Sequence, residues 1–80
     1  MPHLRLFAAA REAAGTGRDE VPGATVGAVL AEACARYGSA FTAVLETSRV
    51  WVNGDTADDT TPVGDDDEVA VLPPVSGGTV

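Results

Sequence analysis

The feature that most restricts the fold is the segment Val26–Tyr37, which carries a single apolar stripe at helical spacing. Its apolar residues recur at i, i+3, i+4, i+7, i+8 and i+11: Val26, Val29, Leu30, Ala33, Cys34 and Tyr37. Such a stripe predicts an amphipathic helix, with Thr25 as its N-cap and Gly38 at its end. A chain of 80 residues has room for one domain, so this helix must bury its stripe against a sheet.

Period-2 alternation supplies the strands of that sheet. It predicts four short strands, at residues 3–8, 18–21, 49–52 and 68–72. Asn53-Gly54 after the third strand is typical of a hairpin turn, and Pro73-Pro74 ends the fourth because proline cannot donate to a ladder. These elements predict an α+β roll, a mixed sheet with one main helix over one face.

The remaining segments are shorter or more polar. The run AAAREAAG, closed by Gly15, and residues 41–45 predict short helical turns, and the polar residues 55–63 are expected at an edge or in a loop. Residues 1–74 are therefore expected to form one domain. Residues 75–80 have little to bury and are expected to form a flexible tail.

The charge of the chain excludes some partners. Twelve Asp and Glu residues outnumber five basic residues, all of them arginine, and the net charge is −7. This charge disfavours nucleic acid and anionic membranes and favours an electropositive protein surface. No apolar run approaches the roughly 20 residues of a membrane span, and no signal-peptide core opens the chain. With Cys34 as the only cysteine, no internal disulfide can form, and we expect a cytoplasmic protein.

Most catalytic constellations are missing from the sequence. One histidine, His3, and one cysteine, Cys34, do not supply the ligands of a zinc site. Cys34 lies on the apolar stripe, where a buried structural role is favoured over a reactive thiol. Residues 65–67 lack the spacing of a calcium loop and predict a solvated acidic turn. We therefore expect no metal, no permanently bound cofactor and no complete active site in this chain.

A partner surface is predicted on the face of the sheet that the helix leaves open. If Val50 and Val52 face the helix, Trp51 points to the other side. That side would also carry Phe7, Ala70 and Leu72, with Arg5 beside them, and the partner surface would continue into Pro73, Pro74 and Val75. The alternative is that a neighbouring loop or the first helical turn covers these side chains.

The end of the chain contains the pair Gly77-Gly78. With nine glycines in the chain such a pair is expected by chance, but its position just beyond Pro73-Pro74 is informative. Two residues without side chains form an extended peptide thin enough to enter a narrow channel in another protein. A group at the end of such a tether can visit two enzymes in turn.

The opening LRLFAAAREAAG and the ending DDDEVAVLPPVSGG carry a resemblance over the whole chain. The sequence resembles the ubiquitin-like sulfur carriers, the MoaD/ThiS family, and within it the small subunit of molybdopterin synthase. The resemblance implies a β-grasp (ubiquitin-like) fold. In that fold the first and last strands pair in parallel at the centre of the sheet, and the helix crosses over between them.

The resemblance also implies a chemistry for the tail. A ubiquitin-activating-like adenylyltransferase would use ATP to adenylate the carboxylate of Gly78, and a sulfur donor protein would convert it to a thiocarboxylate. The thiocarboxylate would donate sulfur to cyclic pyranopterin monophosphate in the large subunit of molybdopterin synthase. Gly78 is then the reactive residue, Gly77 its neighbour in the channel, and the chain itself a non-catalytic sulfur-donor subunit.

Thr79 and Val80 depart from the family pattern, because functional members usually end at the second glycine. Three explanations remain open: a tail-trimming protease removes the dipeptide, the dipeptide is an addition to the natural chain, or the carrier function is lost. Other functions also remain open, namely a sister carrier for thiamine or cysteine biosynthesis, a ubiquitin-like protein modifier, and a bare interaction domain. The sequence Leu72-Pro73-Pro74 is more typical of the molybdopterin branch and favours the first reading.

Overall fold

The computed structural model describes residues 1–74 of the chain. Its elements, in chain order, are β1 (His3–Leu6), α1 (Ala8–Ala14), β2 (Arg18–Glu20), α2 (Val26–Tyr37), α3 (Ser39–Glu46), β3 (Arg49–Val52), β4 (Asp55–Thr56) and β5 (Glu68–Leu72). The expected flexible tail, residues 75–80, lies outside the described residues, and with it the expected site residues Val75, Gly77 and Gly78.

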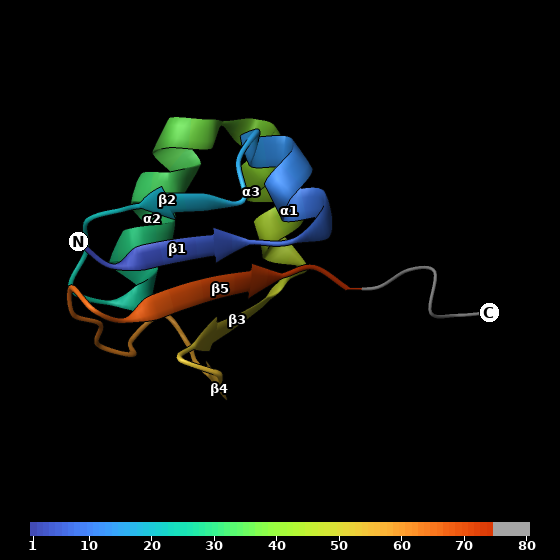
Figure 1. The fold of residues 1–80 in the computed structure, drawn as a ribbon. Helices are drawn as coiled ribbons and strands as arrows, with labels where there is room; N and C mark the ends of the chain where they lie inside the picture. Colours follow the sequence, from blue (N-terminus) through green and yellow to red (C-terminus); the bar gives the residue numbers. More distant parts are fainter. Residues whose placement is uncertain (75–80) are drawn as a thin grey trace.

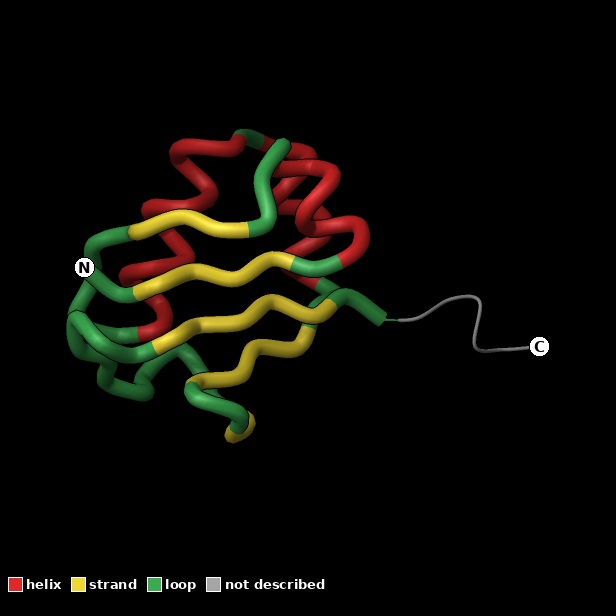
Figure 2. The backbone as a smooth tube through the Cα atoms, in the orientation of Figure 1, coloured by secondary structure: helices red, strands yellow, loops and turns green. Residues whose placement is uncertain are grey.

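The five strands form one mixed sheet in the order β2-β1-β5-β3-β4. β1 and β5, the first and last strands of the chain, lie side by side at the centre and run parallel, whereas the other pairs are antiparallel. Figure 1 shows α2 crossing behind the sheet, and Figure 2 shows the helices in red gathered on one side of the strands in yellow. This is the β-grasp arrangement that the resemblance implies.

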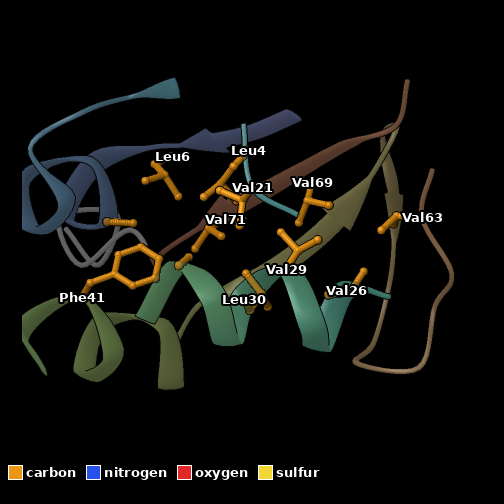
Figure 3. Close-up of a cluster of buried hydrophobic side chains, with 12 residues drawn as sticks. Leu4, Leu6, Val21, Val26, Val29, Leu30, Phe41, Val63, Val69 and Val71 are labelled. Carbon is orange, nitrogen blue, oxygen red and sulfur yellow. The ribbon is translucent and has the colours of Figure 1, made fainter. Parts of the chain in front are cut away.

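The core lies between the sheet and the helices. Alternate residues of the two central strands, Leu4 and Leu6 on β1 and Val69 and Val71 on β5, are at most 2% exposed and point toward the helices (Figure 3). The other members of the cluster are Ala10, Val21, Val26, Val29, Leu30, Ala33, Phe41 and Val63. Because each large apolar side chain stabilises a fold by about 1.5–3 kcal/mol when buried, this cluster is the main source of stability.

The main helix, α2, has the bounds that its apolar stripe predicts. The side chain of Thr25 accepts a hydrogen bond from the backbone N–H of Ala28 at 3.2 Å, which caps the first turn. The backbone N–H of Gly38, whose φ is 92°, closes the last turn by donating to the carbonyl of Cys34. Within the described part of the chain, no helix has the length and apolar character that crossing a membrane requires.

Several element ends differ from the sequence-based expectation. β1 ends at Leu6 rather than at residue 8, because Phe7 is the N-cap of α1 and Ala8 takes a positive φ of 51°. β2 ends at Glu20 rather than at residue 21. α3 is longer than the turn expected at residues 41–45. The polar stretch after the hairpin contains β4, so its expected place at an edge of the sheet is confirmed.

The hairpin between β3 and β4 is confirmed at Asn53-Gly54. Both residues have positive φ, 50° and 87°, as the type I′ turn requires. The side chain of Asn53 also bridges to the next segment. Its Nδ2 donates to Asp67 Oδ1 at 2.9 Å, and its Oδ1 accepts from the backbone N–H of Glu68 at 2.9 Å. The turn therefore ties the hairpin to the start of the central strand β5.

The outer edge of β2 is closed by side chains. In an antiparallel pair alternate residues turn their backbone groups away from the partner strand, and here these residues are Arg18 and Glu20. Thr16 Oγ1 accepts from the N–H of Arg18 at 3.3 Å and donates to its carbonyl at 2.8 Å. The N–H of Glu20 donates to Asp19 Oδ1 at 2.8 Å, and its carbonyl accepts from Arg36 at 3.0 Å. All four outward groups of the strand are thus satisfied.

Asp19 also connects this edge strand to the end of α2. The hydroxyl of Tyr37 donates to Asp19 Oδ2, and Arg36 lies 3.1 Å from the same oxygen. The hydrogen bond from Tyr37 lowers the pKa of Asp19. Burial and the hydrogen bond to Asp19 raise the pKa of Tyr37 to about 12. The ring of Tyr37 packs edge-on against Phe41 with centroids 5.2 Å apart, which links the same contact to α3.

Candidate functional site

The face of the sheet opposite the helices carries the predicted partner surface. Strand register places Arg5, Ala70 and Trp51 in one row across the three central strands. Leu72 lies one step further along β5, and the extended backbone of Phe7 continues β1 beside it. Phe7 is 38% exposed and Leu72 36%, whereas Trp51 and Ala70 are half-buried. The expected apolar patch therefore exists.

The alternative, that the first helical turn covers this patch, is wrong. α1 packs against α3 on the helical side of the sheet, and its one buried residue, Ala10, joins the core. The Phe7 ring is instead accompanied by the guanidinium of Arg5, which lies 5.3 Å from the ring centroid. Phe7 stays exposed despite this cation–π contact, so it can still contact a partner.

The root of the tail is held rigidly. β5 is paired with β1 on one side and with β3 on the other, so Leu72 and the residues that follow start from the centre of the sheet. Pro73 is half-buried and Pro74 exposed, and the chain leaves the domain at this edge beside α1 (Figure 1). The described chain therefore ends beside Leu72 and Phe7.

The other candidates do not form a catalytic site. His3 is exposed at the start of β1 on the open face, whereas Cys34 lies on α2, so the two cannot form a dyad. Cys34 is half-buried rather than fully buried as expected, because it lies at the margin of the core in a groove beside Leu30 and Leu45. In residues 1–74 no group of three potential metal ligands comes together.

The acidic run at residues 65–67 is a solvated turn, as predicted. Asp65 is paired with the amino group of Met1 at 3.0 Å while its side chain stays 88% exposed. Asp67 accepts from the backbone N–H of Gly64 at 2.7 Å and from the amide of Asn53. The first of these hydrogen bonds, with help from the second, lowers the pKa of Asp67. These contacts shape the loop before β5.

A basic hollow next to the patch was missed by the sequence reasoning. It has a volume of about 380 Å³, and its charged lining consists of Arg5, Arg11 and Arg18. These arginines are six and seven residues apart and belong to three different elements, so no periodicity within one element connects them. The only available signal was the pairing of β1 with β2, which places Arg5 opposite Arg18.

Comparison with known proteins assigns the family. The model of the ThiS family matches residues 4–78, which is nearly the whole chain. The chain belongs to the ThiS family. The match ends at Gly78, the second glycine of the pair, and leaves out Thr79 and Val80. The resemblance to the ubiquitin-like sulfur carriers is thereby confirmed at the level of the family.

Solved structures agree with this assignment. The crystal structure of SAMP1 from Haloferax volcanii shares 32% identity with the chain, covers 95% of it and 97% of its own length, and has a TM-score of 0.79. SAMP1 from Methanosarcina acetivorans, the small archaeal modifier protein 1, shares 30% identity, covers 95% and 94%, and has a TM-score of 0.83. A Pyrococcus furiosus protein named "Putative molybdopterin converting factor, subunit 1" shares 27% identity, covers 91% and 95%, and has a TM-score of 0.77. No curated protein matches the chain.

Proposed function

We propose that this chain is the sulfur-donor subunit of a molybdopterin synthase, with Gly78 as the residue that carries sulfur. The observation that supports this most directly is the family match, which covers residues 4–78 and ends at the second glycine. The structure supplies an anchored root for that tail at the end of β5. It also supplies an exposed apolar patch, Phe7 and Leu72, at which a tail-modifying enzyme can dock.

The chemistry requires enzymes that the chain lacks. A carboxylate is a poor electrophile until its oxygen becomes part of a leaving group. In the active site of an adenylyltransferase, the Gly78 carboxylate would attack ATP. This step would form an acyl-adenylate and release pyrophosphate. A sulfur donor protein that carries a persulfide would then displace AMP and form an acyl disulfide. A thiol would reduce the S–S bond, becoming part of a disulfide itself, and release a thiocarboxylate, which ionises readily and is a good nucleophile. The large subunit would bind cyclic pyranopterin monophosphate and receive the sulfur.

The length of the tether limits where this chemistry can take place. Gly78 is the fourth residue after Pro74, and an extended chain spans at most about 3.6 Å per residue. The reacting carboxylate therefore lies within about 15 Å of Pro74. A partner that contacts Phe7 and Leu72 must place its active site within that reach, which restricts docking to this edge of the domain.

The test is intact mass of the chain after co-expression with an adenylyltransferase and a sulfur donor of this family. A chain ending at Gly78 is expected to gain one sulfur in place of one oxygen, and the full chain to be loaded only after a protease removes Thr79 and Val80. Gly78→Trp should block loading without unfolding the domain, because residues 1–74 contain the core. Loading of Gly78→Trp, or no loading of the trimmed chain, would contradict the proposal.

The pathway is tested by co-purification of the loaded chain. The P. furiosus match and the sequence Leu72-Pro73-Pro74 favour the molybdopterin branch. Recovery of the large subunit of molybdopterin synthase is expected. Recovery of a thiazole synthase or a cysteine synthase in its place would assign the chain to the sister pathways for thiamine or cysteine.

A second candidate function is protein modification, because the matched structures include small archaeal modifier proteins. In this case Gly78 would form isopeptide bonds with lysines of target proteins. Digested cell extracts would then contain lysines that carry the Gly77-Gly78 remnant. The chain has no lysine of its own, so it cannot form lysine-linked polymers with itself.

A further inference from the structure

Three arginines from three elements line the basic hollow next to the apolar patch. Arg5 comes from β1, Arg11 from α1 and Arg18 from β2. The lining also includes the ring of Phe7 and the bare backbone of Gly17, but no Asp or Glu. A Cβ atom placed at Gly17 would lie 3.4 Å from the Arg11 side chain, so Arg11 packs close to the backbone of this glycine.

The domain leaves this positive charge largely uncompensated. Arg5 forms one ion pair, with Glu68 at 3.3 Å. Both side chains are more than a third exposed to solvent, so this ion pair contributes little. Neither Arg11 nor Arg18 forms an ion pair with any residue among 1–74. By contrast, Arg36 on α2 is paired with two carboxylates. Arg49 on β3 is also unpaired among the described residues, but it lies outside the hollow, whereas the unpaired Arg11 and Arg18 lie together in its lining.

Two of these arginines face each other in a position that does not favour folding. Arg5 and Arg18 are directly opposite on the antiparallel strands β1 and β2. Side chains at such positions have Cβ atoms about 4.5–5.5 Å apart, and like charges there destabilise a sheet. The chain has only five basic residues and a net charge of −7, so this pairing is not a consequence of a basic composition. A negatively charged ligand would relieve the repulsion.

The form of the hollow suits several carboxylates better than one phosphate. Its guanidinium groups come from three separate elements, which line a hollow of about 380 Å³. Guanidinium groups bind carboxylates through paired hydrogen bonds, so separate acidic side chains could each bind one arginine. The exposed ring of Phe7 adds an apolar contact at the margin.

We infer that the basic hollow binds an acidic segment of a partner protein, with Arg11 and Arg18 each binding a carboxylate side chain. The hollow shares Phe7 with the apolar patch, so one partner covers both. The identity of this partner, an enzyme that handles the tail, rests on the proposed function. This partner segment is acidic, whereas the net charge of the chain favours a partner surface that is electropositive.

The first experiment measures binding of a fluorescein-labelled peptide in which Glu and Asp alternate with Leu. A peptide with Gln and Asn in place of the acids is the control ligand. The double variant Arg11→Gln/Arg18→Gln is expected to weaken binding of the acidic peptide about tenfold, since two exposed charge contacts are lost. Arg49→Gln, which removes the same charge from β3 outside the hollow, should leave the affinity unchanged. Binding should also weaken as salt is raised.

Three results would overturn the inference. The neutral peptide could bind as tightly as the acidic one, or Arg49→Gln could weaken binding as much as the double variant. Pyrophosphate could also displace the peptide and shift the same backbone signals in the spectrum of the ¹⁵N-labelled chain more strongly than the peptide does. That result would make the hollow a phosphate site. Urea unfolding of the double variant should show unchanged or higher stability, because the repulsion between Arg5 and Arg18 is removed.

The rate at which Gly78 is loaded with sulfur distinguishes a failure of this inference from a failure of the proposed function. The assay uses chains that end at Gly78. If the double variant is thiocarboxylated as fast as the chain with both arginines, the hollow does not bind the activating enzyme, while the carrier function stands. If neither form is loaded but the peptide still binds only through Arg11 and Arg18, the proposed function fails and the acidic ligand stands. Slower loading of the double variant alone supports both.

Discussion

Two leucines on opposite sides of the sheet provide the most direct test of the structure. Leu30, on α2, is 7% exposed and packs in the core, as Figure 3 shows. Leu72, at the end of β5, is 36% exposed on the open face beside Phe7. The substitutions Leu30→Ala and Leu72→Ala remove the same atoms, so any difference between them reports the environment of each side chain.

The expected losses of stability differ severalfold. Leu→Ala in a core costs about 2–5 kcal/mol, whereas surface substitutions usually change stability by no more than about 0.5 kcal/mol. A domain of this length has a free energy of unfolding of about 4–12 kcal/mol in total, at about 0.05–0.15 kcal/mol per residue. Leu30→Ala thus removes a large share of it. A loss of about 3 kcal/mol would lower the midpoint of thermal unfolding by about 12–24 °C.

The assay is urea unfolding followed by the fluorescence of Trp51, the only tryptophan, which lies half-buried on β3. Linear extrapolation gives the free energy of unfolding for each variant, and an unchanged slope shows that the unfolded states are comparable. A near-neutral Leu30→Ala would mean that α2 is misplaced. A Leu72→Ala loss as large as that of Leu30→Ala would mean that the open face is covered.

The same two variants should show the reverse order when the rate of Gly78 loading is measured. Leu72→Ala is expected to slow loading of Gly78 by the adenylyltransferase, because it removes part of the docking patch. Leu30→Ala should load normally at a temperature well below its unfolding midpoint. Slow loading of Leu30→Ala under those conditions would argue against docking through the open face.

Two further predictions concern polar contacts within the domain. Burial and the hydrogen bond to Asp19 raise the pKa of Tyr37 to about 12. The stability that this tyrosine contributes is therefore complete below its unfolded pKa of about 10, and it is lost as the pH rises toward 12. The urea midpoint should therefore fall between about pH 9 and pH 11.5, and Tyr37→Phe should lack that fall; an equal fall in both would refute the contact. Asn53→Ala should cost about 1–2 kcal/mol in urea unfolding, chiefly because alanine is strained at the positive φ of this position, with a smaller loss from the two solvent-exposed hydrogen bonds to Asp67 and Glu68. Asn53→Gly relieves the strain and should cost less, and equal losses for the two variants would contradict that account.

The elements that the sequence predicts most accurately are those with local signals at both ends. The bounds of α2 agree because Thr25 and Gly38 cap it. The bounds of β5 agree because an acidic turn precedes it and Pro73-Pro74 follows it. The predicted end of β1 was wrong because Ala8 adopts a positive φ, and an alanine in the sequence does not indicate such a conformation. There the packing of α1 against α3 overrides local preference.

The candidate site divides in the same way. The apolar patch could be predicted because alternation along single strands already separates Trp51 from Val50 and Val52. The basic hollow could not, since it depends on which strand pairs with β1 and where α1 lies. Gly78, which we propose as the reactive residue, lies outside the described residues, and its role remains a prediction.

The closed edge of β2 has a consequence for how such a domain behaves at high concentration. A strand with free backbone groups is a template on which strands of other chains can assemble into aggregates. At β2, another copy would first have to displace the side chains of Thr16, Asp19 and Arg36 from hydrogen bonds they already make. Residues that contribute little to the core thus act as a barrier to polymerisation, and a substitution such as Arg36→Ala would act on solubility before it acts on the fold.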